Sequence, residues 1–191
     1  MHDIAPFVVL FLQVALLFLS GAFIVIALVH IISDAITDVP FVRTNRRSFA
    51  KITEALDIRS GDIVYELGSG DGRFLLWAAR RFPEARFIGI ELNPALVRYA
   101  AWRARRTGNP SNIEYRCADL FETDLRDATK IYSYLLTPIM NKLLPKLEVE
   151  LKNVRLASCA FQFQDKKPMR TVRLSEKRGY HGEETLYVYE F

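Results

Sequence analysis

Cysteine and histidine are scarce in this 191-residue chain, which has two cysteines and three histidines. Cys117 and Cys159 lack metal-ligand spacing and fall within apparent strands, so we expect small buried side chains in a reducing compartment. His2, His30 and His181 are isolated in the sequence, and we assign them no catalytic role. The chain therefore shows no metal-ligand set and no Ser-His-Asp or Cys-His arrangement, and internal repeats are absent.

Charge is absent from residues 4–29, where Gln13 and Ser20 are the main polar interruptions. The run exceeds the about 20 residues that a helix needs to cross a bilayer. A cleavable signal peptide normally begins with basic residues, and neither Lys nor Arg precedes this run. We predict an uncleaved transmembrane anchor over residues 1–33, a connector with a helix over 34–60, and a globular domain over 61–191.

Basic residues are missing from the short segment before the anchor, which carries Asp3. Four basic residues follow the anchor: Arg43, Arg46, Arg47 and Lys51. Because Lys and Arg collect on the inner side of membranes, we predict a single-pass protein with its N-terminus outside. The globular domain then lies in the cytoplasm, or in the matrix of an organelle. The net charge of +4 is compatible with anionic lipid or nucleic acid and requires neither.

The globular domain is organised around residues 62–73, which read D-I-V-Y-E-L-G-S-G-D-G-R. A β-branched apolar run, a glycine turn and an amphipathic helix form a ligand site at the carboxyl end of a parallel sheet. The G-x-G-x-G spacing differs from the dinucleotide pattern. Glu66 and Asp71 would repel a pyrophosphate but suit a ligand with a positive centre and an amino group. A connecting turn without a ligand and a nucleotide-binding oxidoreductase are the alternatives.

Helix and strand patterns alternate along this domain. We predict helices over 48–57, 74–82, 95–106 and 139–151, and strands over 86–91, 112–117, 130–136, 154–163, 171–174 and 185–189. This order implies an α/β fold with a doubly wound, mostly parallel sheet and a C-terminal antiparallel hairpin. The helix over 95–106 carries four arginines, which form either a solvated face or a contact with membrane or RNA phosphates.

Acidic residues follow two further strands. Glu91 lies about twenty residues after the glycines, where an acid accepts hydrogen bonds from ribose hydroxyls. Asn93 is placed to cap the next helix, which begins with Pro94. Asp119 follows the third strand, either as part of the same site or as a cap or turn residue.

The glycines and the acids at three strand ends together resemble the class I, seven-strand S-adenosylmethionine-dependent methyltransferases, which have a Rossmann-like sheet. The resemblance implies that the glycine turn surrounds the methionine part of S-adenosylmethionine, Glu91 holds the ribose, and Asp119 contacts the adenine amine. It also places Leu92 against the adenine. The implied cofactor-binding residues are Glu66, Gly68, Ser69, Gly70, Asp71, Gly72, Glu91, Leu92, Asn93, Asp119 and Leu120.

A narrower resemblance covers nearly the whole chain. The chain is similar to membrane-anchored, mitochondrial-type protein-lysine methyltransferases and their prokaryotic relatives. The similarity is carried by the anchor, the connector V-P-F-V-x-T, the motifs E-L-G-S-G-D-G-R and G-I-E-L-N-P, D-L after the third strand and L-x-P after the fourth. Those enzymes act on the adenine nucleotide translocase and the ATP synthase c subunit. The sequence departs from them at Arg43, and the likeness is weakest over residues 162–182. Because both regions are candidates for substrate contact, the resemblance does not fix the identity of the substrate.

This resemblance implies methylation of a lysine in a membrane protein, with the bilayer as a partner and no metal. Phe41, Thr44, Thr137 and Pro138, with Leu136, are the candidate substrate pocket, in which carbonyl and hydroxyl groups orient the amine. D/N-P-P-Y, common in amino-methyltransferases of DNA bases and glutamine, is replaced by L-L-T-P, which argues against a DNA substrate and leaves RNA open. With a membrane protein as the implied substrate, we do not expect a nucleic-acid partner. A small-molecule or lipid methyltransferase and a non-catalytic binding module are the alternatives.

Overall fold

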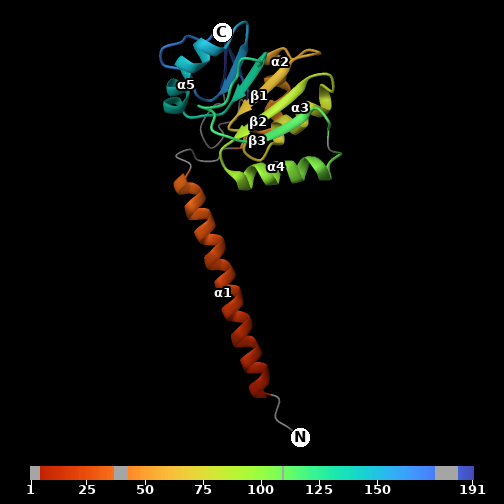
Figure 1. Ribbon diagram of the computed structural model, residues 1–191, viewed down its shortest axis with the longest axis vertical. Coiled ribbons are helices and arrows are strands. Elements are labelled where there is room, and N and C mark those ends of the chain that lie inside the picture. Colours follow the sequence, from red (N-terminus) through yellow and green to blue (C-terminus); the bar gives the residue numbers. More distant parts are fainter. Residues whose placement is uncertain (1–4, 37–42, 109, 175–184) are drawn as a thin grey trace. The chain divides into compact units, whose positions relative to one another are not determined.

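The computed structural model in Figure 1 describes residues 5–36, 43–108, 110–174 and 185–191, with side chains of the first range described from 8 to 27. The chain divides into two compact units, Met1–Pro40 and Phe41–Phe191. Our domain boundaries at residues 33 and 60 stay predictions. The two short helices over residues 46–56 fall within the second unit, with the sheet.

The first unit contains one long helix, α1, Ala5–Ile36. Within it, Val8–Ala27 is long and apolar enough to cross a membrane. Large apolar side chains such as Phe11, Leu17 and Phe18 are more than 70% exposed. A helix that is apolar on all sides is typical both of membrane spans and of helices buried in a large core.

The second unit is built on a seven-stranded sheet in the order β3-β2-β1-β4-β5-β7-β6. The strands are β1 Ile63–Leu67, β2 Arg86–Glu91, β3 Ile113–Cys117, β4 Lys130–Ser133, β5 Arg155–Cys159, β6 Arg170–Arg173 and β7 Thr185–Glu190. The first five pair in parallel, and β7 pairs antiparallel with both β5 and β6. The predicted doubly wound sheet with a terminal antiparallel hairpin is therefore confirmed.

Helices cover both faces of this sheet (Figure 1). They are the 3-10 helix η1 Arg46–Ser48 and the α-helices α2 Phe49–Leu56, α3 Arg73–Arg81, α4 Pro94–Arg106 and α5 Thr137–Glu150. Residues of α2 and α3 pack in one core cluster, for example Phe49 and Phe74 with Phe87 of β2. Residues of α5 pack in the other, for example Leu143 with Ile88. Because side chains alternate along a strand, Glu66 and Glu91 lie on the same face as Phe87.

Two sequence expectations about this domain were wrong. Cys117 is exposed, although Cys159 is buried as expected. The reason is that β3 forms the edge of the sheet, where an outer strand is covered incompletely. The strands expected over 130–136 and 154–163 end earlier, at Ser133 and Cys159. At the second of these ends, Ala160 has a positive φ of 63°, which breaks the extended backbone.

Candidate functional site at the carboxyl ends of the strands

The glycine turn connects β1 to α3 and bends back over the end of β2. The backbone amides of Gly68 and Ser69 both donate to the carbonyl of Ile90 at 2.9 Å. Gly72 has a φ of 67° and precedes the first residue of α3. A Cβ atom on Gly72 would lie 2.5 Å from the ring of Tyr115, whose hydroxyl donates to the Gly72 carbonyl at 2.8 Å. Glycine is therefore required at this position by both backbone conformation and space.

Glu91 ties the glycine turn to the end of β2. One carboxylate oxygen accepts from the Gly70 amide at 2.9 Å, and the other accepts from the Asn93 amide at 2.9 Å. The side chain of Asn93 in turn accepts from the amide of Ala95 and caps α4. Each carboxylate oxygen has a second lone-pair position beyond these bonds. The acid that follows the second strand is thus held beside the turn, with acceptor capacity remaining.

Glu66 is a buried acid whose carboxylate is only partly hydrogen-bonded by the described residues. Its side chain is 6% exposed, and within the described chain its Oε2 and the buried Ser69 Oγ have no hydrogen-bond partner. Burial, followed by the negative charges of Asp71 and Glu91, raises the pKa of Glu66 well above its ordinary value. A buried oxygen without a partner is costly. A cationic group at this place would supply a partner and favour the ionised carboxylate.

Asp71 has a different environment from the one we expected. Its carboxylate is buried, accepts from Arg73 Nε at 3.0 Å, and lies 3.4 Å from Arg103 Nη1. Burial alone would raise the pKa of Asp71, but the bonds from Arg73 and the charge of Arg103 outweigh it and hold the pKa below its ordinary value. The Arg103 guanidinium also donates to the Asp71 carbonyl at 3.2 Å. Arg43 Nε also lies 3.9 Å from this carboxylate, so Asp71 is an ionised anchor for three arginines of the chain.

Arg103 is therefore a site residue that sequence reasoning missed. We grouped it with the other arginines of its helix as part of one outer face, but its side chain is only 20% exposed. Helical spacing alone does not reveal this contact, because the partner is in another element of the fold.

The third acid, Asp119, forms a turn at the end of β3. Its Oδ1 accepts from the Phe121 amide at 2.8 Å, and its carbonyl accepts from Thr123. The amide of Ala118 donates to the carbonyl of Glu91 at 3.1 Å. Asp119 thus has the turn role that we weighed, and it follows the strand end that lies beside Glu91. Leu92, which directly follows Glu91 at the end of β2, is 47% exposed.

The proposed substrate side of the site lies beyond β4. Thr44 is buried, and its hydroxyl is hydrogen-bonded to the Tyr132 hydroxyl at 2.8 Å. Tyr132 is the register partner of Glu66 in the β1–β4 pair, so both side chains share one sheet face. Tyr132 was not among the sequence candidates, because it reads as an ordinary core residue.

The segment that joins β4 to α5 lies beside the glycine turn. Leu135 is buried, and its side chain would lie 2.8 Å from a Cβ atom at Gly68. Thr137 is half-buried and begins α5, whereas Pro138 is exposed. Phe41 lies outside the described residues. The structure therefore brings Thr44 and the L-L-T-P segment to the same edge as the acids, and it adds Tyr132 and Leu135.

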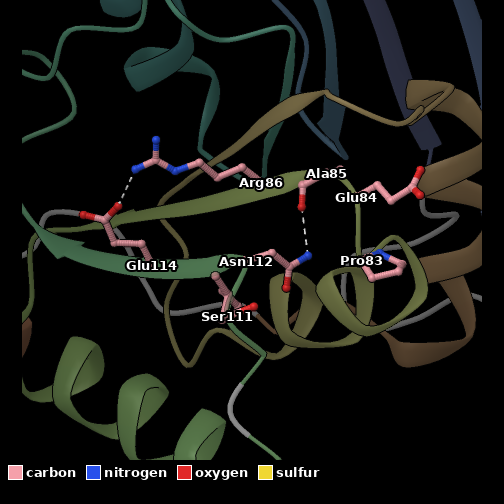
Figure 2. Close-up of a pocket in the computed structure, with 8 residues that line it drawn as sticks. Pro83, Glu84, Ala85, Arg86, Ser111, Asn112 and Glu114 are labelled. Atoms are coloured by element: carbon pink, nitrogen blue, oxygen red, sulfur yellow. Dashed lines mark hydrogen bonds and ion pairs between the residues drawn. The ribbon is translucent and has the colours of Figure 1, made fainter.

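A hollow also exists at the opposite edge of the sheet, where β2 and β3 begin (Figure 2). Arg86 and Glu114 form an ion pair of 3.0 Å across it. The side-chain Nδ2 of Asn112 donates to the carbonyls of Ala79, Phe82 and Ala85. This side chain therefore joins the end of α3 and the loop after it to the start of β3. No predicted site residue lines the hollow, and Figure 2 shows the Arg86–Glu114 ion pair and the hydrogen bond from Asn112 to Ala85 within it.

Comparison with known proteins identifies a matching family and named relatives. The family described as the ANTKMT methyltransferase domain matches residues 66–170. A protein-lysine N-methyltransferase of Saccharolobus islandicus (strain REY15A) is 32% identical over 152 residues, covering 79% of this chain and 92% of the relative. The lysine N-methyltransferase of the ATP synthase c subunit from Rattus norvegicus is 31% identical over 153 residues, covering 79% of this chain and 66% of the relative.

A solved structure has the same fold. It is an RNA methyltransferase from Salinibacter ruber in complex with S-adenosyl-L-homocysteine, 35% identical, with a TM-score of 0.71, covering 78% of this chain and 93% of the other. S-Adenosyl-L-homocysteine is the demethylated product of S-adenosylmethionine. The cofactor is therefore S-adenosylmethionine, as the sequence resemblance implied, and the unpartnered Glu66 oxygen and the exposed Leu92 suit its cationic and apolar parts.

Proposed function

This chain belongs to the ANTKMT methyltransferase domain family, and we propose that it transfers methyl groups from S-adenosylmethionine to a lysine side chain of a membrane protein. The observation that carries the proposal is the set of acids at the carboxyl ends of β1 and β2 in a chain whose curated relatives are named lysine methyltransferases. The relatives' names supply the acceptor class, and the acids supply the place for a cationic methyl donor.

We assign the cofactor-holding role to the glycine turn and the acids around it. When bound, S-adenosylmethionine supplies a methyl group on a positively charged sulfur, ready for in-line displacement. Glu66 ionises against that positive charge, because the charge offsets the burial that now raises its pKa. Glu91 accepts from the ribose with its remaining lone pairs, while its bonds to Gly70 and Asn93 fix its position. Leu92 covers one side of the adenine, and Asp119 contacts its amine.

The acceptor lysine enters from the side of Thr44 and the L-L-T-P segment in this proposal. A lysine has a free pKa near 10.4 and must lose a proton before it attacks. The buried Tyr132 and Leu135 form an apolar surrounding, which lowers the pKa of an amine. The hydrogen-bonded hydroxyls of Thr44 and Tyr132 orient the neutral amine, and alignment in a dry site supplies most of the rate enhancement.

The membrane part of the proposal rests on the composition of α1 and on the chain after it. Val8–Ala27 meets the length and apolarity of a membrane span, and we assign it as a single-pass anchor. Arg43, Arg46, Arg47 and Lys51 follow, which favours the catalytic domain on the cytoplasmic or matrix side. An anchored enzyme stays near membrane-embedded acceptors, and the rat relative is named for such a substrate.

RNA is a second candidate acceptor, because the Salinibacter ruber structure is named an RNA methyltransferase. One observation favours lysine over RNA: the curated relatives described above are named lysine methyltransferases. The same assay distinguishes the two acceptors.

The test uses the full chain in membranes together with S-adenosylmethionine that carries a labelled methyl group. We expect the label in a membrane protein, and mass spectrometry should place it on a lysine. Glu91→Gln should abolish most of the labelling, because the glutamine can accept from only one of the two backbone amides. Glu84→Gln is the matched control, since Glu84 is an exposed acid at the opposite edge of the sheet.

Label that appears in RNA, with none in protein, would transfer the proposal to the second candidate. Label only in lipid would indicate a lipid methyltransferase. Cofactor binding without any labelled product, in membranes that contain all three acceptor classes, would refute catalysis of this kind.

A further inference from the structure

The outer side of α4 carries a surface that the methyl-transfer site does not use. We call it the arginine–aromatic face, formed by Arg98, Tyr99, Trp102, Arg105 and Arg106, all of which are exposed. Tyr99 and Trp102 are 43% and 50% exposed. Exposed tyrosine and tryptophan on one short helix indicate a contact surface, because such large apolar area is unfavourable in water.

The aromatic rings and the guanidinium groups of this face are stacked on one another. The rings of Tyr99 and Trp102 lie 5.7 Å apart with an interplanar angle of 23°. The guanidinium carbon of Arg106 lies 5.3 Å from the Trp102 ring centroid, and that of Arg103 lies 4.8 Å from the Tyr99 ring. Stacking holds these side chains in place. The Arg103 guanidinium is bonded to Asp71 and Tyr99, whereas the Arg106 guanidinium is on an exposed residue, where its N–H groups face solvent.

The core does not need this face. The opposite side of α4 carries the buried Ala100 and Ala104, and the helix lies against β2 and β3. Arg103, on the flank of the face, is held by Asp71. Packing therefore accounts for one side of α4. On the other side Tyr99 accepts a hydrogen bond from Arg103 at 3.0 Å, whereas Arg98, Trp102, Arg105 and Arg106 are exposed and lie outside the core.

We propose that the arginine–aromatic face binds the surface of an anionic lipid bilayer. α4 contains four arginines and no acidic residue, so its charge is complementary to lipid phosphates. Tryptophan and tyrosine are the residues that prefer the membrane–water interface, since their rings are apolar and carry one polar group. Guanidinium groups bind phosphate through paired N–H donors.

The anchor strengthens this choice of partner, and to that extent the inference rests on the proposed function. A domain tethered by Val8–Ala27 stays near the bilayer, which raises the local concentration of lipid at its surface. Single-stranded RNA also combines phosphates with stacking bases. We therefore include RNA as an outcome of the test that would contradict the proposal.

The test uses tryptophan fluorescence of the full chain, which has two tryptophans. Trp77→Phe leaves Trp102 as the single reporter, and phenylalanine preserves an aromatic ring beside Phe49. The protein is reconstituted in vesicles of phosphatidylcholine alone or with phosphatidylglycerol, each with brominated acyl chains as quenchers. We expect Trp102 to be quenched in the anionic vesicles and much less in the neutral ones.

The triple variant Arg98→Gln, Arg105→Gln and Arg106→Gln should reduce quenching in anionic vesicles to the neutral level. Each basic residue near an anionic surface contributes about a fivefold factor to its attraction, so three give about a hundredfold at low salt. The control variant Arg80→Gln, Arg81→Gln and Lys152→Gln removes the same charge from exposed positions elsewhere and should retain the quenching.

Equal Trp102 quenching in both vesicle types, or equal loss in the two triple variants, would overturn the proposal. So would a Trp102 response to a mixed-sequence single-stranded RNA with none to anionic vesicles. Flotation with neutral vesicles reports the anchor separately. A protein that floats without lipid-dependent quenching contradicts the α4 inference alone, whereas quenching without flotation contradicts the anchor alone.

Discussion

Replacement of Glu91 tests the link between the glycine turn and cofactor binding. Its two oxygens accept from the amides of Gly70 and Asn93, each at 2.9 Å. A hydrogen bond to a charged group contributes about 1.5–3 kcal/mol. Because Glu91 is half-buried, water replaces part of each bond, and we use the lower value. Glu91→Ala should then lower the free energy of unfolding by about 3 kcal/mol, and Glu91→Gln by about half of that.

The same variants should weaken cofactor binding by about as much free energy as they weaken the fold. Glu91→Ala removes the ribose acceptor and also releases the Gly70 amide, so we expect a dissociation constant raised by about 100-fold, equivalent to about 2.7 kcal/mol. Urea unfolding followed by circular dichroism, and calorimetric titration with S-adenosyl-L-homocysteine, measure the two effects on the full chain in detergent. Glu84→Ala is the control and should change stability by less than about 0.5 kcal/mol.

Two results would refute this reasoning. An unchanged dissociation constant in Glu91→Ala would remove Glu91 from the cofactor site. Equal destabilisation by Glu91→Gln and Glu91→Ala would show that the hydrogen bonds from the Gly70 and Asn93 amides do not contribute separately to the free energy of unfolding.

Three further predictions concern the same edge of the sheet. Gly72→Ala should lower the free energy of unfolding in urea by about 2–5 kcal/mol, because the strain of a positive φ adds to a clash with the Tyr115 ring. Gly61→Ala is the control, since Gly61 also has a positive φ but faces open space, and it should cost only about 1–2 kcal/mol. The folded-state pKa of Glu66 is raised above its ordinary 4.5. Its contribution to the free energy of unfolding is therefore present below pH 4.5 and is lost as pH rises through the folded-state pKa. Glu66→Gln should remove this pH dependence of the free energy of unfolding, measured by unfolding curves at pH values across that transition. Thr44→Val should lower the free energy of unfolding by about 1–3 kcal/mol, since it removes the hydroxyl that is bonded to the buried Tyr132 hydroxyl. Double-mutant cycles with Tyr132→Phe should show coupling.

The sequence alone determined the elements whose signal is local. Residues 4–29 lack charge, and an apolar helix formed there as expected. The strand, glycine turn and helix over residues 62–73 were also readable, because the turn conformation depends on glycine at fixed positions. Spacing placed Glu91 at the end of β2, and Asn93 caps α4 as predicted.

The tertiary structure alone decided which charges meet one another and which side chains are covered. The pairing of Asp71 with Arg103 joins the glycine turn to a distant helix, and the bond between Thr44 and Tyr132 spans 88 positions of the chain. Cys117 is exposed because its strand is the outermost of the sheet. Periodicity and motif spacing report the few residues around each position, whereas these contacts depend on the order in which the strands assemble.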